Sequence, residues 1–130
     1  MKSPLQVEDA PKAIGPYTQA QVVRLHGGQK LVYSSGQVGL DPKTGDLVPG
    51  GIQAETRAML ENVGRLLDAV GLTFADVVKC TVYLRDFADF GAMNTVYREF
   101  FQTDAPTRAT VGVTALAADY SIEIEVMAAR

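Results

Sequence analysis

The side chains that could do chemistry gather in the last two strand-like segments of the sequence. Residues 108–116 alternate between polar and small apolar types, which places Arg108 and Thr110 on one face. Residues 120–128 alternate in the same way and separate Glu123 from the aliphatic positions. A guanidinium can bind a carboxylate through two parallel hydrogen bonds, and a glutamate can take a proton from water. The alternation predicts that Arg108 and Glu123 share the polar face of a sheet, with the apolar faces of both strands under the helices.

That polar face is weakly charged for a solvated sheet surface. It carries hydroxyls, glycine, one arginine and the two glutamates Glu123 and Glu125, without the many lysines that solvent-facing sheets display. One interpretation is burial against another subunit, with a few polar groups kept for a purpose. The other is a partly solvated face on which an arginine and a glutamate pair across strands for structural reasons. The alternation leaves both interpretations open.

The segments that must position these residues follow the order ββαβαββ. The expected elements are strands at 18–25 and 30–38, a helix at 52–70, a strand at 77–84, a helix at 87–101, and strands at 108–116 and 120–128. The first two strands form a hairpin through the glycines of His26-Gly27-Gly28, and turn residues make 40–51 a long loop. Amphipathic helices of this length must cover a sheet face. The expected fold is α+β, with one mixed sheet and two helices on one face.

Composition limits the classes of function. The chain of 130 residues is 47% hydrophobic, which fits one domain over residues 1–130. Twelve basic against fifteen acidic residues give a net charge of −3, with no basic stripe, so no nucleic-acid partner is expected. The lone Cys80 cannot form an internal disulfide, and no apolar run resembles a signal peptide or membrane span. These features favour a cytoplasmic protein without a membrane partner.

Several common kinds of catalytic site lack support in the sequence. His26 lies in a turn with no visible nucleophile partner, so a serine or cysteine triad is not indicated. No His, Cys, Asp or Glu cluster has metal-binding spacing, and no glycine-rich phosphate loop opens a helix. Cys80 alternates with Val78 and Val82, which is typical of a small buried residue. We therefore expect no metal and no cofactor.

Four segments of the sequence carry a resemblance to a known family. They are Ala10-Pro11 with Ala13-Ile14-Gly15-Pro16-Tyr17, Ser35-Gly36-Gln37 with Asp41-Pro42-Lys43-Thr44-Gly45, Asp89-Phe90 with Asn94, and Pro106-Thr107-Arg108 with Ile122-Glu123-Ile124-Glu125. In this order and spacing they resemble the reactive-intermediate deaminase (Rid) family over nearly the whole chain. The resemblance implies a chorismate-mutase-like ββαβαββ sandwich. It also implies a homotrimer with active sites in the clefts between subunits.

The resemblance further implies the hydrolysis of 2-imino acids, such as 2-iminobutanoate and 2-iminopropanoate, to 2-keto acids and ammonia without a cofactor. Arg108 matches the family arginine that binds the substrate carboxylate. Glu123 matches the glutamate that positions and activates the attacking water. Both residues are therefore the expected catalytic pair. Glu125 is expected to be structural, because only Glu123 matches the catalytic position of the family.

Five further positions match the family's substrate-binding residues. They are the side chains of Tyr17, Ser35 and Asn94 and the backbone N–H groups of Gly36 and Thr110. The residues also have structural interpretations. Tyr17 could be a core or interface aromatic, Ser35 a hydroxyl at a strand end, and Asn94 a hydrogen-bonding residue on the buried stripe of its helix.

The chain departs from the family pattern where substrate range is set. Thr110 stands where many members have cysteine, Gly112 where many have glutamate, and residues 117–119 lack a Pro-Lys pair. Two other functions remain open: an RNA-cleaving translation inhibitor, and a non-catalytic trimer that binds keto acids or acts like a chaperone. The acidic balance disfavours the first. Retention of Arg108 and Glu123 disfavours the second.

Overall fold

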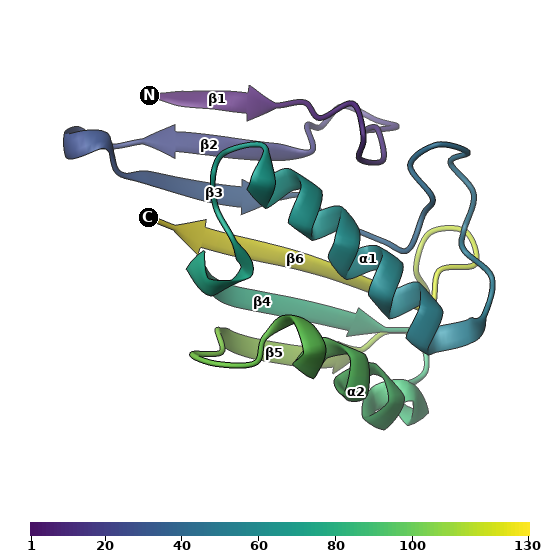
Figure 1. Cartoon of the computed structure of the whole chain (residues 1–130). Coiled ribbons are helices and arrows are strands. Elements are labelled where there is room, and N and C mark those ends of the chain that lie inside the picture. The colour runs from purple at the N-terminus through teal and green to yellow at the C-terminus, as the bar shows by residue number, and fades with distance from the viewer.

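The first three strands form one half of the sheet in the computed structural model, which describes residues 1–130 (Figure 1). They are β1 (Lys2–Leu5), β2 (Ala20–Arg24) and β3 (Lys30–Ser34). The predicted β2–β3 hairpin is confirmed, and both strands are shorter than expected. Gly27 and Gly28 turn the chain with φ values of 76° and 80°, which side chains with a Cβ rarely adopt. The edge strand β1 was not predicted, because four residues including Pro4 give no alternating signal.

Two helices and three strands complete the fold. They are α1 (Gly51–Asp68), β4 (Val77–Leu84), α2 (Phe90–Phe100), β5 (Thr107–Gly112) and β6 (Ile122–Ala129). The start of the predicted second helix is a separate 3-10 turn, Phe87–Asp89. Strand β5 ends at Gly112, and residues 113–121 form a loop in place of the predicted strand end. Ala118 has a φ of 48° and lies in the predicted connection between the two strands, which the structure extends in both directions.

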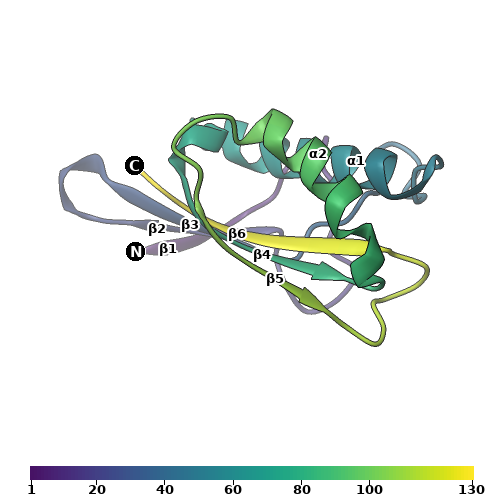
Figure 2. The same ribbon diagram turned by 90° about the horizontal axis from the view of Figure 1, so that it is seen from below.

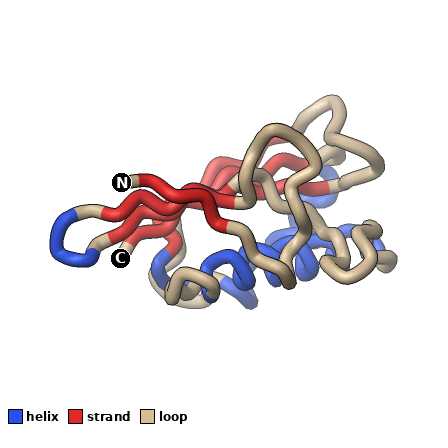
Figure 3. The backbone as a smooth tube through the Cα atoms, turned by 90° about the horizontal axis from the view of Figure 1, so that it is seen from above, coloured by secondary structure: helices blue, strands red, loops and turns tan.

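The strands pair in the order β1-β2-β3-β6-β4-β5, parallel between β4 and β5 and antiparallel elsewhere. Both helices cover the same face, so the predicted α+β fold with a mixed sheet is confirmed (Figure 2). Figure 3 shows the strand layer and the helix layer from above. The core between the layers includes Leu60 and Val63 of α1, Val82 and Leu84 of β4, and Ile124 of β6. Neither helix is long and apolar enough to cross a membrane.

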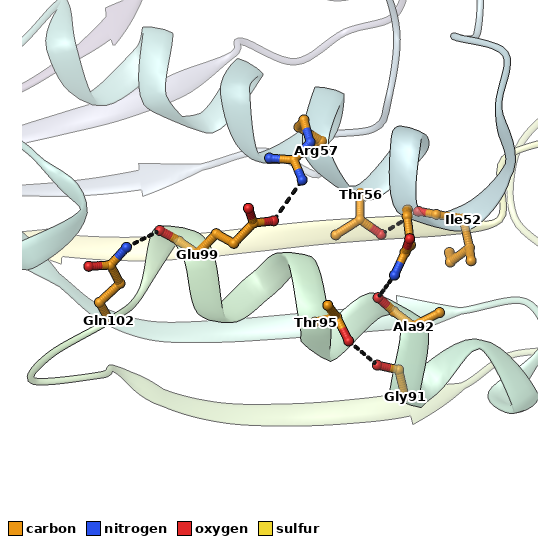
Figure 4. A network of polar contacts seen from close by, with 9 residues as sticks. Ile52, Thr56, Arg57, Gly91, Ala92, Thr95, Glu99 and Gln102 are labelled. Carbon is orange, nitrogen blue, oxygen red and sulfur yellow. Dashed lines mark hydrogen bonds and ion pairs between the residues drawn. The ribbon is translucent and has the colours of Figure 1, made fainter.

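Exposed polar contacts join the two helices across their outer surface. Arg57 of α1 and Glu99 of α2 form an ion pair at 2.6 Å, and Gln53 donates a hydrogen bond to the Ala92 carbonyl at 3.3 Å (Figure 4). Both side chains of the ion pair are about half exposed. Solvent screens such a pair, so it contributes at most about 1 kcal/mol. Packing of the apolar faces therefore dominates the attachment of the helices.

The prediction that Arg108 and Glu123 share a face is wrong. Arg108 pairs in register with Cys80, whose side chain is fully buried under the helices, so Arg108 also lies on the helix side. Glu123 pairs with Tyr83 and lies on the opposite, uncovered face, while Ile124 beside it is buried. The apolar side of β5 thus faces away from the helices, and Val111 there is 40% exposed. Alternation separates the two faces of a strand correctly, but it cannot tell which face a helix covers when the helix offers partners for a charge.

Candidate functional site

The first of two candidate half-sites surrounds Arg108 at the edge strand β5. Its Nη1 atom donates a hydrogen bond to Asn94 Oδ1 at 2.8 Å. Its Cζ atom lies 4.6 Å from the ring centroid of Tyr97 and 5.5 Å from that of Phe90, so the guanidinium rests on two π faces. We call these four residues the Arg108 half-site. All three partners come from α2, which explains why a charged residue is tolerated on the helix side of the sheet.

The Arg108 guanidinium has no carboxylate partner in the chain. The two ion pairs of the structure, Arg57–Glu99 and Arg130–Asp76, both lie elsewhere. An Arg–Glu pair across the last two strands is therefore excluded within one copy. A half-buried guanidinium that keeps unused N–H donors is suited to bind an anion, and its planar fork matches a carboxylate.

Two buried hydroxyls near Arg108 lack hydrogen-bond partners. They are Tyr97 Oη and Thr110 Oγ1. Burial raises the pKa of Tyr97, so this phenol stays neutral at physiological pH. Beneath it, burial also raises the pKa of the Cys80 thiol, and Cys80 is a small buried residue as predicted. The helix side of β5 therefore carries a single fixed positive charge among neutral groups.

The second half-site surrounds Glu123 on the uncovered face. The Glu123 side chain lies directly over the backbone of Gly36, where a Cβ atom would come within 2.7 Å of the carboxyl carbon. Backbone hydrogen bonds between Gln37 and Ile124, 2.7 and 3.0 Å long, fix this approach. A pocket of about 130 Å³ opens beside the carboxylate. We call it the Glu123 pocket, and its lining includes Lys12, Tyr17, Gly36, Tyr120 and Glu123.

The surroundings of Glu123 favour its protonated form more than water does. Burial raises the pKa of the Glu123 carboxyl, and the negative charge of Glu125 raises it further. Glu125 itself accepts a hydrogen bond from Tyr83 Oη at 2.9 Å, which agrees with the predicted structural role. A carboxyl group with a raised pKa in a small pocket is a candidate for proton transfer.

A buried glutamine holds the N-terminal wall of the Glu123 pocket. Gln19, 5% exposed, accepts a hydrogen bond from the Val7 backbone N–H at 2.6 Å. Its amide nitrogen donates to the carbonyl oxygens of Val7 at 3.2 Å and Pro11 at 2.8 Å. One side chain thus organises the loop that leads to Tyr17. This role could not be predicted from the sequence, because an isolated glutamine has no distinguishing pattern.

Two polar residues of α1 hold the other walls. Asn62, fully buried, donates to the carbonyl oxygens of Val38 and Leu40 at 3.0 and 2.9 Å. Glu55, 4% exposed, accepts a hydrogen bond from the Ser121 backbone N–H at 2.7 Å. These bonds attach the 36–40 segment and the 113–121 loop to the helix. Both residues occupy the apolar stripe of α1, and a polar residue on such a stripe is the signal that could have revealed them.

The structure divides the predicted site residues between the two half-sites. Tyr17 and Gly36 line the pocket with Glu123, and Tyr17 is 51% exposed, which rules out a core role. Asn94 lies beside Arg108, and Thr110 is the next residue along the same face of β5. Ser35 is outside the pocket lining, and its hydroxyl donates to the Thr18 carbonyl at 2.5 Å. No three His, Cys, Asp or Glu side chains lie close enough together to hold a metal ion.

Comparisons with known proteins place these half-sites in a family context. The model of the family described as Endoribonuclease L-PSP matches residues 7–130. A goat (Capra hircus) protein named 2-iminobutanoate/2-iminopropanoate deaminase is 46% identical over 121 residues, covering 93% of this chain and 85% of the goat protein. A candidate endoribonuclease from Thermotoga maritima superposes with a TM-score of 0.93 at 41% identity, covering 100% and 98% of the two chains. Escherichia coli TdcF, solved with bound serine, gives a TM-score of 0.88 at 40% identity and 98% coverage of each chain.

Proposed function

The chain belongs to the Endoribonuclease L-PSP family, and from that premise we propose that it is a hydrolytic deaminase converting 2-imino acids to 2-keto acids and ammonia. The resemblance to reactive-intermediate deaminases is confirmed, since mammalian relatives of 44–47% identity carry the deaminase name. The observation that carries the proposal is the free, π-supported guanidinium of Arg108, which provides a site for the substrate carboxylate. We propose that residues 1–130 form one such domain.

The proposed reaction needs only orientation and one proton acceptor. Arg108 binds the carboxylate of the 2-imino acid through its fork and so fixes C2. Glu123 holds a water molecule over C2 and takes its proton as the oxygen adds to the C=N carbon. Glu123 returns this proton to the nitrogen, which gives a carbinolamine. The C–N bond then breaks as the hydroxyl proton passes to the nitrogen, so that ammonia leaves and the hydroxyl carbon becomes the carbonyl carbon of the 2-keto acid. Each atom comes from substrate and water, so the chemistry requires no cofactor.

We propose that the two half-sites meet between copies of the chain, in a homotrimer. Arg108 and Glu123 lie on opposite faces of one sheet, so a single copy cannot bring both to one substrate. The face that carries Glu123 is not covered by helices (Figure 2). Tyr33 and Val111 lie on this face and are 41% and 40% exposed. Covering this face with another subunit would bury apolar surface and bring a second copy close to the Glu123 pocket.

The remaining substrate-binding residues fit this arrangement as proposals. Tyr17 covers the Glu123 pocket, and the backbone N–H of Gly36 faces the ligand there. Asn94 orients the Arg108 fork, and the Thr110 N–H binds the substrate from β5. The Ser35 oxygen can still accept a hydrogen bond from the substrate while its proton is donated to Thr18.

The alternative of RNA cleavage is less well supported. The chain has a net charge of −3, and its one free guanidinium at the site suits a single carboxylate better than a phosphate backbone. A non-catalytic keto-acid-binding or chaperone-like trimer would not need a carboxyl of raised pKa in the Glu123 pocket. The lone, buried Cys80 is compatible with a reducing compartment, and we propose a cytoplasmic enzyme.

Subunit complementation tests both the activity and the intersubunit site. Imines are generated in situ from amino acids by an amino-acid oxidase, and their disappearance is followed with the wild type, Arg108→Ala, Glu123→Gln and a refolded mixture of the two variants. Each variant alone should be inactive, while the mixture should regain activity at sites that combine an intact Arg108 with an intact Glu123 from different copies.

The control is a mixture of Arg108→Ala with the Arg108→Ala/Glu123→Gln double variant, which contains no intact Arg108. If the mixture of Arg108→Ala and Glu123→Gln stays inactive while the wild type hydrolyses imines, the intersubunit site formed by these two residues is overturned. A wild type that leaves the imine lifetime unchanged would overturn the deaminase proposal itself.

A further inference from the structure

We infer that an aromatic wall formed by Phe87 and Phe90 contacts the substrate side chain, so that the enzyme favours 2-imino acids with bulky apolar side chains. Phe90 and Phe87 are stacked, with centroids 5.2 Å apart and ring planes 16° apart. Phe90 lies 5.5 Å from the Arg108 guanidinium carbon, and Phe87 lies one ring further along. The wall therefore continues from the group that binds the carboxylate. This inference rests on the proposed function and adds a substrate class to it.

Phe87 is exposed although the fold has an apolar core beside it. Its side chain is 50% exposed, whereas Phe101 is 7% exposed. The 3-10 turn that carries Phe87 is fixed by Asp86, whose side chain accepts a hydrogen bond from the Ala88 N–H at 3.0 Å. An apolar ring that stays in water contributes none of the free energy that its burial would give on folding. The capped turn holds the Phe87 ring in this exposed position, which makes the ring available for contact with a ligand.

The floor beside Phe87 is open because β5 carries a glycine there. A Cβ atom at Gly112 would lie 3.6 Å from the Phe87 ring, which is ordinary contact. Gly112 shares the helix side of β5 with Arg108 and Thr110. Its φ is not in the left-handed region, so the backbone does not require glycine at this position. The fold therefore does not require a glycine here, and its lack of a side chain leaves space next to the Phe87 ring.

Substrate geometry connects the wall to specificity. All 2-imino acids share the carboxylate and C2, and they differ only in the substituent on C2. With the carboxylate on Arg108, a one- or two-carbon substituent can reach Phe90 at most. A branched or aromatic substituent is long enough to contact Phe87 as well. The wall therefore adds binding for imines derived from leucine or phenylalanine and little for the imine derived from alanine.

The test compares kcat/KM for imines derived from alanine, leucine and phenylalanine. The wild type should prefer the two larger imines, and Phe87→Ala should lower their kcat/KM by about 10-fold or more, the usual effect of removing several apolar contacts. The alanine-derived imine should be almost unaffected. Leu25→Ala is the matched control, because Leu25 is similarly exposed at 43% but lies beyond the end of β2.

A second variant fills the same space from the floor. Gly112→Leu places a side chain against the Phe87 ring and should cause the same selective loss. Equal losses for all three imines, or a change in molecular mass by light scattering, would mean that Phe87 supports assembly and would overturn the inference. Unchanged substrate ratios in both variants would also overturn it and would leave the proposed function intact. Failure of the wild type to hydrolyse any imine would instead reject the proposed function.

Discussion

The two half-sites are built in different ways. The Arg108 half-site belongs to regular elements: a residue of β5 rests against three residues of α2. The Glu123 pocket has one residue on a strand and walls made of three loops, each tied by a buried polar side chain: Gln19, Asn62 or Glu55.

The difference follows from what each charge has to do. A guanidinium keeps its charge at any physiological pH, so it needs only a rigid support and free donors. A carboxylate that exchanges protons needs a local environment that raises its pKa, and loops can surround it more closely than a flat sheet can. We therefore expect Arg108 to control binding of the substrate carboxylate and Glu123 to control turnover.

The largest expected effect comes from Glu123→Gln. The amide keeps the shape of the side chain but cannot take a proton, so hydrolysis should fall by roughly 10²-fold or more, the usual loss for a general base. Binding of 2-oxobutyrate should persist, because the Arg108 half-site lies on the other face and is unchanged. Calorimetric titration with 2-oxobutyrate measures binding, and the rate of imine hydrolysis measures turnover. If Glu123→Gln retains turnover, Glu123 is not the general base.

A substitution in the Arg108 half-site should have a smaller effect, and this effect should be on binding. Arg108→Lys keeps the charge but loses the second hydrogen bond to the carboxylate and the planar contact with Tyr97. Affinity for 2-oxobutyrate should fall about 10-fold or more, the scale of one charge-assisted hydrogen bond. The same calorimetric titration measures it, with circular dichroism as the check on folding. Near-normal binding by the lysine variant would show that Arg108 has only a structural role.

The contrast between the halves also explains what the sequence could predict. Helix α1 and strand β4 have strong periodic patterns, and both were located within two residues of their observed ends. Arg108 and Glu123 were identified as candidates from their types and from the family resemblance. Their separation on opposite faces was missed, because it depends on the α2 side chains that support Arg108. The walls of the Glu123 pocket were missed because long-range hydrogen bonds such as Gln19 to Val7 leave no periodic signal.

The Glu123 pocket should be sensitive to substitutions in the buried side chains that hold its loops. Gln19→Leu removes the amide that holds the Val7 and Pro11 backbone groups, and buried groups left unpaired cost about 1–3 kcal/mol. We expect a lower free energy of unfolding in urea and a several-fold higher KM, because the Tyr17 loop loses its anchor. Gln29→Leu, at an exposed turn position, is the matched control. A variant that loses stability but keeps its KM would limit Gln19 to a structural role.

The smallest effect concerns the proton affinity of Glu123 and is read from pH dependence. Burial is the main cause of the raised pKa of Glu123, and the charge of Glu125 is the second. Glu125→Gln removes that charge, which favours ionised Glu123 and lowers its pKa. Because the ionised form is the proposed base, activity is lost as pH falls through this pKa, so the acid limb of kcat/KM should move to lower pH. The acid limb should move only part of the way toward the pH expected for an ordinary glutamate, since burial still raises the pKa of Glu123. Tyr83→Phe is the control, because it removes the 2.9 Å hydrogen bond but keeps the Glu125 charge that raises the pKa of Glu123. Lys12, Tyr17 and Tyr120, which line the pocket with Glu123, are unchanged in both variants. A limb that moves to higher pH, or that does not move in Glu125→Gln, would show that another group sets the pH dependence.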